Sequence, residues 1–484
     1  MGLAWRLHSK RGTMKSKILL IAVIAILTTP SVYATDFFDS VETIGGATPP
    51  PIYKAHYDIG INFDELQEGP NSLTFNLPNG ITTTVDVTDF FPRQGYEYFD
   101  EDIHPPGSPP FWIEPGTPHE EIGYKWSGSN DDYDVLISVH SGVLYGIITG
   151  NNFRYGMSRI HNGNYRMYEF DYEYFPRTDI LEDTFTNINQ GLISEQDQSK
   201  TFVSHLKSFD FSRQPDNSRS NTTVIDVLIV WTEDARVAAG GDPNNANDTA
   251  DIEALMVTSM DHANTALANS AMNTRLTKFH TAKYNGFSYS GSFGTDLLNF
   301  KNNVAIKNLR NQVGADTTIA LIGNDFNQFE ACGVAYVQTF PGCSKINPVP
   351  GCNAGTVFKE SSYAMVTEFC SIWDDAFTHE IGHNMGANHV NDFFQLPAGW
   401  ANSVINNGFP DAFGHEVSTF KSIMAVSDPT TARRLNFSNL NVQVNGVNTG
   451  VTNSTNNARV IDLLTPVMSN FATRPDLIFA DGFE

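Results

Sequence analysis

Residues 379–389 read His-Glu-Ile-Gly-His-Asn-Met-Gly-Ala-Asn-His. His379 and His383 are one helical turn apart, so a helix would stack both imidazoles on one stripe, where they can bind one Zn²⁺ at about 2.0–2.1 Å each. Gly386 permits a left-handed turn that ends the helix and returns His389 to the metal as a third ligand. Three protein ligands leave the fourth position for water, which is the arrangement of a catalytic zinc site.

Glu380 follows the first histidine and cannot reach the metal in the same geometry. It is placed to accept a proton from a zinc-bound water, so we predict it as the general base. The alternative is that three surface histidines coincide. The chain has 13 histidines, and at average composition the full pattern is an accident on the order of one in ten thousand or rarer.

The sequence around this motif predicts a helix over residues 371–385. Ser371 can cap it, and Asp374 and Asp375 fall in the first turn, where the helix dipole favours negative charge. An apolar residue recurs every four positions, which gives the helix a face to pack on a sheet. These residues are Trp373, Phe377 and Ile381.

Residues 223–472 predict an α/β (α+β) domain with a mixed, twisted sheet. Residues 224–230 form a continuous apolar run with one Asp, typical of a strand covered on both faces. A long helix is expected over about 249–272. Strand–helix–strand order of this kind is typical of an α/β domain. Further strands are expected at 275–284, 317–322, 332–339 and 363–369.

Residues 35–222 predict a separate β-rich, propeptide-like module. It holds 29 acidic and 11 basic residues and no cysteine. A hairpin is expected around Pro78-Asn79-Gly80, and four strands between residues 135 and 170 alternate with Gly and Asn turns as in a meander. The polar stretch 213–223 predicts a linker where the chain could be cut.

The N-terminal residues predict export. Lys15 and Lys17 precede an apolar run from Ile18 to Leu27, so residues 1–34 are expected to be a signal peptide and the protein secreted. The run is too short to cross a bilayer, and we expect no membrane span.

A formal charge of −24 repels phosphate backbones, so nucleic acid is not an expected partner. We expect a monomer, with a C-terminal tail at 473–484.

The four cysteines lie at positions 332, 343, 352 and 370. In an exported protein this favours two disulfides over a thiolate metal site, because no Cys-x-x-Cys pair is present. Of three connectivities, we expect the nested one, with Cys332 bonded to Cys370 and Cys343 bonded to Cys352. The first bridge would join an edge strand to the start of the motif helix.

The eleven-residue motif resembles the signature of the metzincin zinc peptidases. That resemblance implies a downstream methionine turn, and Ser422-Ile423-Met424-Ala425 begins at the right distance, with Met424 35 residues after His389. Met424 is then a hydrophobic floor under the zinc site and not a ligand. Val426 stands where astacins and serralysins have a tyrosine ligand, so that ligand is missing.

Residues 223–472 resemble most closely the reprolysin-like branch, including secreted bacterial peptidases of the peptidyl-Asp type. The resemblance rests on Asn384 within the motif, on Cys332-Gly333-Val334-Ala335-Tyr336, on Phe437-Ser438-Asn439 and on a closing helix at 457–472. Reprolysins usually place Asp after the third histidine, whereas this chain has Val390.

These residues predict a secreted zinc endopeptidase made as a zymogen, with protein or peptide substrates. Substrate is expected to lie extended beside the edge strand near 333–336 and to pair with it through main-chain hydrogen bonds. The alternatives are a non-peptidase zinc hydrolase and a catalytically inactive binding module. Retention of Glu380 and of all three histidines argues against the second alternative.

Three further features remain open in the sequence. Arg433 and Arg434 follow the methionine turn and either form a solvated pair or line a pocket that selects Asp or Glu after the cut. Loop 240–248 offers Asp and Asn oxygens to calcium, but it lacks a calcium-loop pattern, which favours a plain loop. His415 is expected to be a loop histidine outside the metal site.

Overall fold

The structure is a computed structural model. It describes residues 35–44, 52–67, 69–93, 97–98, 123–130, 132–150, 153–160, 163–171, 177–179, 203–210, 222–323, 331–338, 359–390, 409–425, 431 and 433–472. The predictions for residues 1–34, the linker at 213–221, the pair Cys343 and Cys352, Val426 and the tail lie outside these residues. Within the described part of the chain, no helix is long and apolar enough to cross a membrane.

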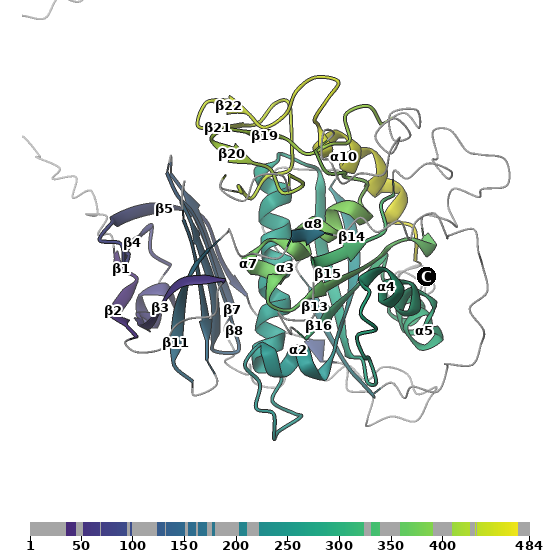
Figure 1. The fold of residues 1–484 in the computed structure, drawn as a ribbon, viewed down its shortest axis with the longest axis horizontal. Helices are drawn as coiled ribbons and strands as arrows, with labels where there is room; N and C mark the ends of the chain where they lie inside the picture. The colour runs from purple at the N-terminus through teal and green to yellow at the C-terminus, as the bar shows by residue number, and fades with distance from the viewer. Residues whose placement is uncertain are drawn as a thin grey trace, which may run out of the picture. The chain divides into compact units, whose positions relative to one another are not determined.

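A ten-stranded sheet, called here the meander sheet, is built from residues 35–170 (Figure 1). The predicted hairpin is confirmed, because β4 and β5 pair antiparallel around Gly80, which has φ +79°. The predicted meander is confirmed by β8 to β11, each antiparallel to the next. Across the sheet the order is β1 (Thr35–Asp36), β4 (Ser72–Asn76), β5 (Thr82–Arg93), β7 (Gly123–Ser129), β8 (Asp134–His140), β9 (Val143–Thr149), β10 (Arg154–Arg159), β11 (Tyr165–Phe170), β3 (Tyr53–Ile61) and β2 (Phe38–Thr43). One short helix, α1 (Phe63–Gln67), follows β3.

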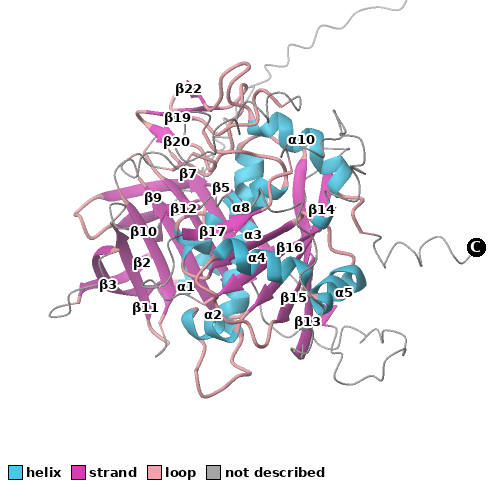
Figure 2. Cartoon of the chain, turned by 45° about the vertical axis from the view of Figure 1, so that its right-hand side comes forward, coloured by secondary structure: helices cyan, strands magenta, loops and turns pink. Residues whose placement is uncertain are grey.

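An eight-stranded mixed sheet forms the second layer (Figure 2). Its strand β14 is parallel to β15 and β16, β16 is parallel to β18, and β17 is antiparallel to β18, so the predicted mixed sheet is confirmed. Residues 225–231 of β14 are buried, as the apolar run predicted. The order is β12 (Arg177–Asp179), β17 (Ala331–Ala335), β18 (Tyr363–Thr367), β16 (Thr317–Ile322), β14 (Thr223–Trp231), β15 (Thr274–Lys283), β13 (Val203–Asp210) and β6 (Glu97–Tyr98).

Three strands of the mixed sheet come from before residue 222. Strand β12 pairs parallel to β17, β13 pairs antiparallel to β15, and β6 pairs with β13. The sequence placed this whole stretch in a separate module because of its acidic composition. Composition does not report strand pairing, so these long-range contacts were not predicted.

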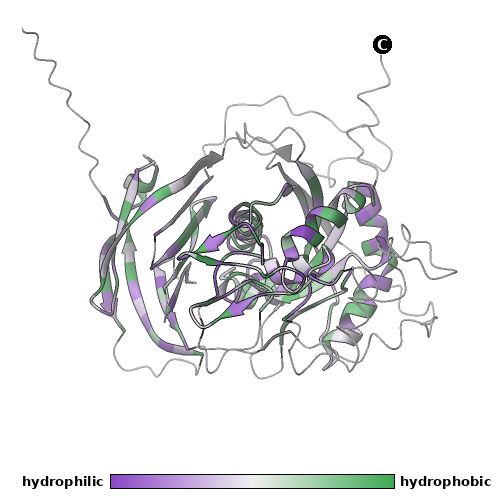
Figure 3. Ribbon diagram, turned by 90° about the horizontal axis from the view of Figure 1, so that it is seen from above, coloured by the Kyte–Doolittle hydropathy of each residue, from purple (hydrophilic) through white to green (hydrophobic). Residues whose placement is uncertain are grey.

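Helix α3 (Ala250–Asn269) contacts both sheets. It packs against β8 and β9 of the meander sheet, and against β15 of the mixed sheet. Of its 20 residues, 17 are buried. Figure 3 colours the residues by hydropathy and shows both hydrophobic and hydrophilic bands on the strands. A helix that is buried all round needs cover on both sides, and the two sheets supply it.

The remaining elements frame the sheets. Helix α2 (Glu233–Ala238) follows β14, and α4 (Phe293–Asn302) and α5 (Val304–Val313) contribute to a hydrophobic cluster with Leu228 and Val230. Two small hairpins are formed by β19 (Glu416–Val417) with β20 (Phe420–Lys421) and by β21 (Gln443–Val444) with β22 (Val447–Asn448). Helix α10 (Asn457–Met468) is the predicted closing helix.

The single helix predicted for residues 371–385 is wrong, because the chain forms two helices there. Helix α7 (Cys370–Trp373) ends at Asp374, and α8 (Ala376–Asn384), called here the histidine helix, begins after Asp375. Asp375 has φ +56° and ψ +21°, a left-handed conformation that no helix can continue through. Ser371 is not a cap, since its hydroxyl lies 2.7 Å from that of Ser259 in α3.

The apolar stripe is divided by the same break. Phe377 and Ile381 lie on the histidine helix, but Trp373 ends α7 and faces the meander sheet. Its ring centroid lies 5.8 Å from that of Phe170 and 5.9 Å from that of Tyr145. Trp373 therefore packs on a different sheet from the one that the sequence predicted.

Candidate metal centre

The three motif histidines converge. The Nε2 atom of His389 lies 3.0 Å from Nε2 of His379 and 3.1 Å from Nε2 of His383. All three side chains are buried, and they form the one group of potential metal ligands found within the described ranges. Three nitrogens directed at one point are a donor set that fits Zn²⁺.

The opposite ring nitrogens face main-chain carbonyls. Nδ1 of His379 lies 2.9 Å from the carbonyl of Ile423, and Nδ1 of His383 lies 2.8 Å from that of Ala387. A carbonyl can only accept, so each Nδ1 carries the proton and each Nε2 keeps its lone pair for a metal. Folding alone therefore selects the tautomer that binds a cation.

A glycine turn brings the third histidine back, as predicted. Gly386 has φ +101°, and the amide of Ala387 donates to the carbonyl of Gly382 at 2.9 Å. The amide of Asn388 then donates to the carbonyl of Ala412 at 2.7 Å, which fixes the chain immediately before His389.

Glu380 is fully buried and faces β17 of the mixed sheet. A Cβ atom added to Gly333 of β17 would lie 2.7 Å from Oε1 of Glu380 and 2.8 Å from its Cγ. Such distances are too short for ordinary contact, so the glycine makes room for the carboxylate. The sequence placed residue 333 on a strand at the edge of the sheet, whereas β12 pairs with the outer side of β17 in the structure. The contact between Gly333 and Glu380 was not predicted.

Met424 lies directly beneath the histidine helix. A Cβ atom added to Gly382 would be 2.9 Å from its sulfur and 2.8 Å from the ring of Phe437. Both Met424 and Phe437 are completely buried. The methionine is therefore an apolar floor, as predicted, and the small residue Gly382 allows the helix to approach it.

Asn384 and a disulfide bond join the motif region to the mixed sheet. The amide of Asn384 donates to the carbonyls of Tyr336 (2.9 Å) and Tyr363 (3.1 Å), and its oxygen accepts from the Thr317 hydroxyl at 2.8 Å. The predicted disulfide between Cys332 and Cys370 is confirmed. It joins β17 to α7, so the strand beside Glu380 is covalently tied to the segment that precedes the helix.

The start of the histidine helix carries two buried ion pairs that the sequence did not predict. Arg154 of β10 binds Asp375, with Nη2 2.6 Å from Oδ1 and Nη1 2.8 Å from Oδ2. Arg433 binds Asp374, with Nη1 3.1 Å from Oδ1. These carboxylates therefore bind guanidinium groups instead of acting only on the helix dipole.

The arginine pair after the methionine turn is not solvated. Arg433 is 3% exposed and Arg434 is 2% exposed, which contradicts a pair on the surface. Arg434 donates from Nη1 to Oδ2 of Asp134 at 2.8 Å, and this aspartate begins β8 of the meander sheet. Each guanidinium thus already binds a carboxylate.

His415 stays apart from the metal ligands. Its Nδ1 lies 3.2 Å from the Thr455 hydroxyl, and burial lowers the pKa of its imidazole. It is absent from the metal-ligand group formed by the described residues.

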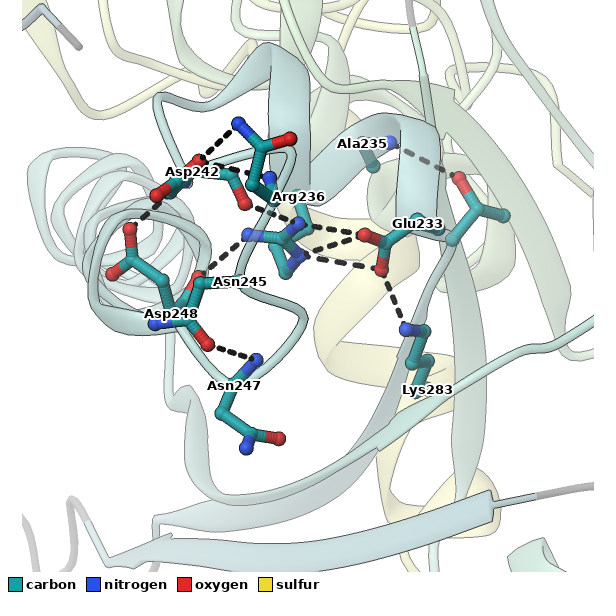
Figure 4. Close-up of polar contacts among 10 residues, drawn as sticks. Glu233, Ala235, Arg236, Asp242, Asn245, Asn247, Asp248 and Lys283 are labelled. Carbon is teal, nitrogen blue, oxygen red and sulfur yellow. Dashed lines mark hydrogen bonds and ion pairs between the residues drawn. The ribbon is translucent and has the colours of Figure 1, made fainter.

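Loop 240–248 is organised by a guanidinium (Figure 4). The buried Arg236 donates to the carbonyls of Asp248 and Asp242, both at 2.9 Å, and to Glu233 at 2.6 Å. The Asp248 carboxylate accepts from the Asp242 amide at 2.8 Å. Main-chain oxygens of the kind that calcium requires are here bound by an arginine, which supports the plain-loop interpretation.

Comparison with known proteins agrees with this geometry. Residues 253–390 match the family model described as Metallo-peptidase family M12B Reprolysin-like. The peptidyl-Asp metalloendopeptidase of Stenotrophomonas maltophilia strain R551-3 is 29% identical over 259 residues, which are 50% of this chain and 52% of the relative. That of Pseudomonas aeruginosa is 29% identical over 168 residues, 34% of this chain and 25% of the relative. The chain thus spans about half or less of these relatives.

A solved structure, that of metalloproteinase-II from Bacteroides fragilis, aligns over 83% of this chain and 94% of that one. The sequence identity is 11% and the TM-score 0.38, too low to support an argument about the fold. The sequence match over 253–390 confirms the predicted resemblance to the reprolysin-like branch.

Proposed function

We propose that this chain, which carries a reprolysin-like metallopeptidase domain, is a zinc-dependent endopeptidase. The observation that carries the proposal is the convergence of three buried imidazole nitrogens, with the buried carboxylate of Glu380 on the same helix as two of them. His379, His383 and His389 would hold the metal. When bound, zinc polarises the scissile carbonyl and lowers the pKa of a coordinated water to about 7.

Glu380 is the proposed general base. Its carboxylate adjoins the histidines in sequence and is enclosed against Gly333, so it has little freedom to turn away. It accepts the proton of the attacking water and delivers it to the leaving amine. A base whose position is fixed before substrate arrives needs no reorganisation during the reaction.

The proposed substrate path runs along β17. An extended peptide would add to this edge by main-chain hydrogen bonds and pass Gly333 beside Glu380. In this structure β12 pairs with the edge, with Arg177 opposite Ala331 and Asp179 opposite Gly333.

We therefore propose that the chain is made as a zymogen, in which β12 takes the place of substrate. The chain has no cysteine before Cys332, so a cysteine in the preceding segment cannot block the metal. A strand that pairs with β17 would keep substrate away without contributing any ligand to the metal. Removal of β12 would free β17 for substrate.

We further propose a preference for acidic residues after the cut. Support comes from the relatives, which are peptidyl-Asp metalloendopeptidases. Arg434 is the better candidate for the selecting cation, because its partner Asp134 is 30% exposed while Asp374, the partner of Arg433, is 9% exposed. A substrate carboxylate would compete more easily with the exposed partner.

Export completes the proposal. The basic and apolar residues before position 34 support a cleaved signal, and the Cys332–Cys370 disulfide is of a kind that persists in oxidising compartments. N-terminal sequencing of protein from the culture medium tests this point.

The enzymatic test uses the processed protein. Zinc content is measured together with hydrolysis of casein, with and without a chelator. We expect one zinc per chain, loss of hydrolysis on chelation and recovery when zinc is restored. Hydrolysis that resists complete removal of zinc would contradict the proposal.

A further inference from the structure

Arg154 reaches from the meander sheet to the start of the histidine helix. This residue begins β10, and its side chain is 2% exposed. The guanidinium binds both carboxylate oxygens of Asp375, and its Nη2 also donates to the carbonyl of Ile372 at 3.0 Å. One side chain of the first sheet thus holds both sides of the break between α7 and α8.

Asp375 is the residue from which the histidine helix starts. Its carbonyl accepts from the amide of His379 at 2.9 Å, so the position of Asp375 sets the position of the first metal-binding histidine. Its left-handed conformation, with φ +56°, is uncommon for a residue other than glycine. The bidentate pair with Arg154 keeps the residue in that conformation.

The charge on this aspartate depends on the same arginine. Burial alone would raise the pKa of Asp375, but the Arg154 guanidinium and the ring of His262 hold that pKa well below its ordinary value. His262 of α3 lies 3.4 Å from Oδ1, and burial lowers the pKa of this histidine. Without Arg154, the buried carboxylate would lose the guanidinium that binds both of its oxygens.

The contact between the meander sheet and the rest of the chain is wider than this pair. Arg159 binds Asp251 of α3 at 2.6 and 2.9 Å, and Ser138 donates to Asp261 of the same helix at 2.8 Å. Gly156 approaches Trp373 so closely that a Cβ atom would lie 2.7 Å from the indole.

Apolar residues join across the same contact. Tyr145 and Phe170 of the meander sheet belong to one buried cluster with Met260 of α3 and Ile381 of the histidine helix. Loss of the sheet would expose this apolar cluster to water. It would also remove Ser138, Arg154 and Arg159 from the buried carboxylates that they bind, and both changes destabilise a folded protein.

We propose that Arg154 is a positioning residue of the metal centre and that residues 35–171 stay bound to the catalytic domain in the active enzyme. The inference rests on the proposed zinc peptidase function and separates two parts of the preceding segment. Strand β12 blocks the substrate edge and must leave, whereas the meander sheet holds the start of the histidine helix and must remain. Cleavage on both sides of β12, within residues 172–176 and within residues 180–202, would release this strand without releasing the sheet.

The first test compares Arg154→Met with Arg159→Met. Both remove a guanidinium that pairs with an aspartate across the same contact, but Arg159 ends on α3 at Asp251 and not at the histidine helix. We expect Arg154→Met to weaken zinc binding, measured by competition with a chelator, by about ten- to a hundredfold. It should lower kcat with little change in KM, and Arg154→Lys should restore part of both.

Arg159→Met is expected to lower Tm while zinc affinity stays within about twofold of wild type. Equal zinc affinity in wild type and Arg154→Met would overturn this inference and leave the proposed function standing. If wild type itself neither binds zinc nor cleaves peptides, the proposed function falls, and this inference falls with it.

The second test leaves every residue of this contact unchanged. Sites for a sequence-specific protease are placed within residues 172–176 and within residues 180–202 of the full chain, and the cut protein is passed through a size-exclusion column under native conditions. We expect the fragment containing residues 35–171 to elute with the zinc-bound, active fraction. Full specific activity in a fraction that lacks this fragment would overturn the inference.

Discussion

Gly333→Ala is predicted to disable the enzyme while leaving its metal in place. The added Cβ would meet Oε1 of Glu380 at 2.7 Å, whereas ordinary contact begins at 3.4 Å, so the oxygen would have to recede by about 0.7 Å. Glu380 is fully buried, so its side chain cannot swing out into solvent to avoid the added atom. A misplacement of about 1 Å at a reacting group costs on the order of a hundredfold in rate.

The expected loss is therefore about a hundredfold in kcat, or about 2.7 kcal/mol of transition-state stabilisation. Zinc content should stay at the wild-type value, because the clash involves the base and none of the three histidines. Val334→Ala is the matched control, since Val334 is the next residue on the strand and its side chain packs in the cluster on the opposite face. It should lower Tm with kcat within a few-fold of wild type.

The assay measures kcat, KM and bound zinc on processed protein, with a peptide substrate. Wild-type kcat in Gly333→Ala would refute the reasoning, because the carboxylate would then tolerate displacement. Loss of zinc in the same variant would refute it differently, since it would show that the strand supports the histidines and not the base.

Three further predictions follow from the described contacts. Glu380→Gln should keep its zinc and lose nearly all peptidase activity, whereas His383→Ala should lose zinc as well; metal analysis and peptide hydrolysis decide. In a peptide library, Arg434→Ala should reduce the enrichment of Asp and Glu after the cut more than Arg433→Ala; equal profiles for both variants and wild type would contradict the proposed preference. Burial raises the pKa of Glu368 to about 8 from its ordinary 4.5, so the folded protein holds a proton that the unfolded chain releases. The free energy of unfolding should therefore fall as pH rises from about 4.5 to about 8, and Glu368→Gln should flatten this dependence in denaturant titrations.

The histidine set could be predicted because its geometry is local. Spacings of four and six residues, with a glycine between, determine where three side chains can meet once a helix and a turn form. The strands of the mixed sheet were predictable for a similar reason, because burial on both faces requires a continuous apolar run such as 224–230. Local rules of this kind do not depend on distant residues.

The break at Asp375 could not be predicted because its cause is distant. An aspartate in the first turn of a helix is favourable by every local rule. What places Asp375 in a left-handed conformation is a pair with Arg154, which is 221 residues away in sequence. A motif thus reveals which residues bind the metal, while the residues that hold the motif in place lie in another part of the chain.

Helix α3 gives a further reason for the second sheet. Ile252, Leu255, Met256 and Ala263 lie on one side of the helix, and the polar residues Thr258 and Asp261 on the other side are buried as well. One sheet can cover only one side of a helix, so a helix whose polar side is also buried requires a second layer. Within the described residues, α3 packs against β15 of the mixed sheet on one side and against β8 and β9 of the meander sheet. The burial of both sides of α3 is thus a physical reason, independent of Arg154, to expect that the meander sheet remains when the chain is cut.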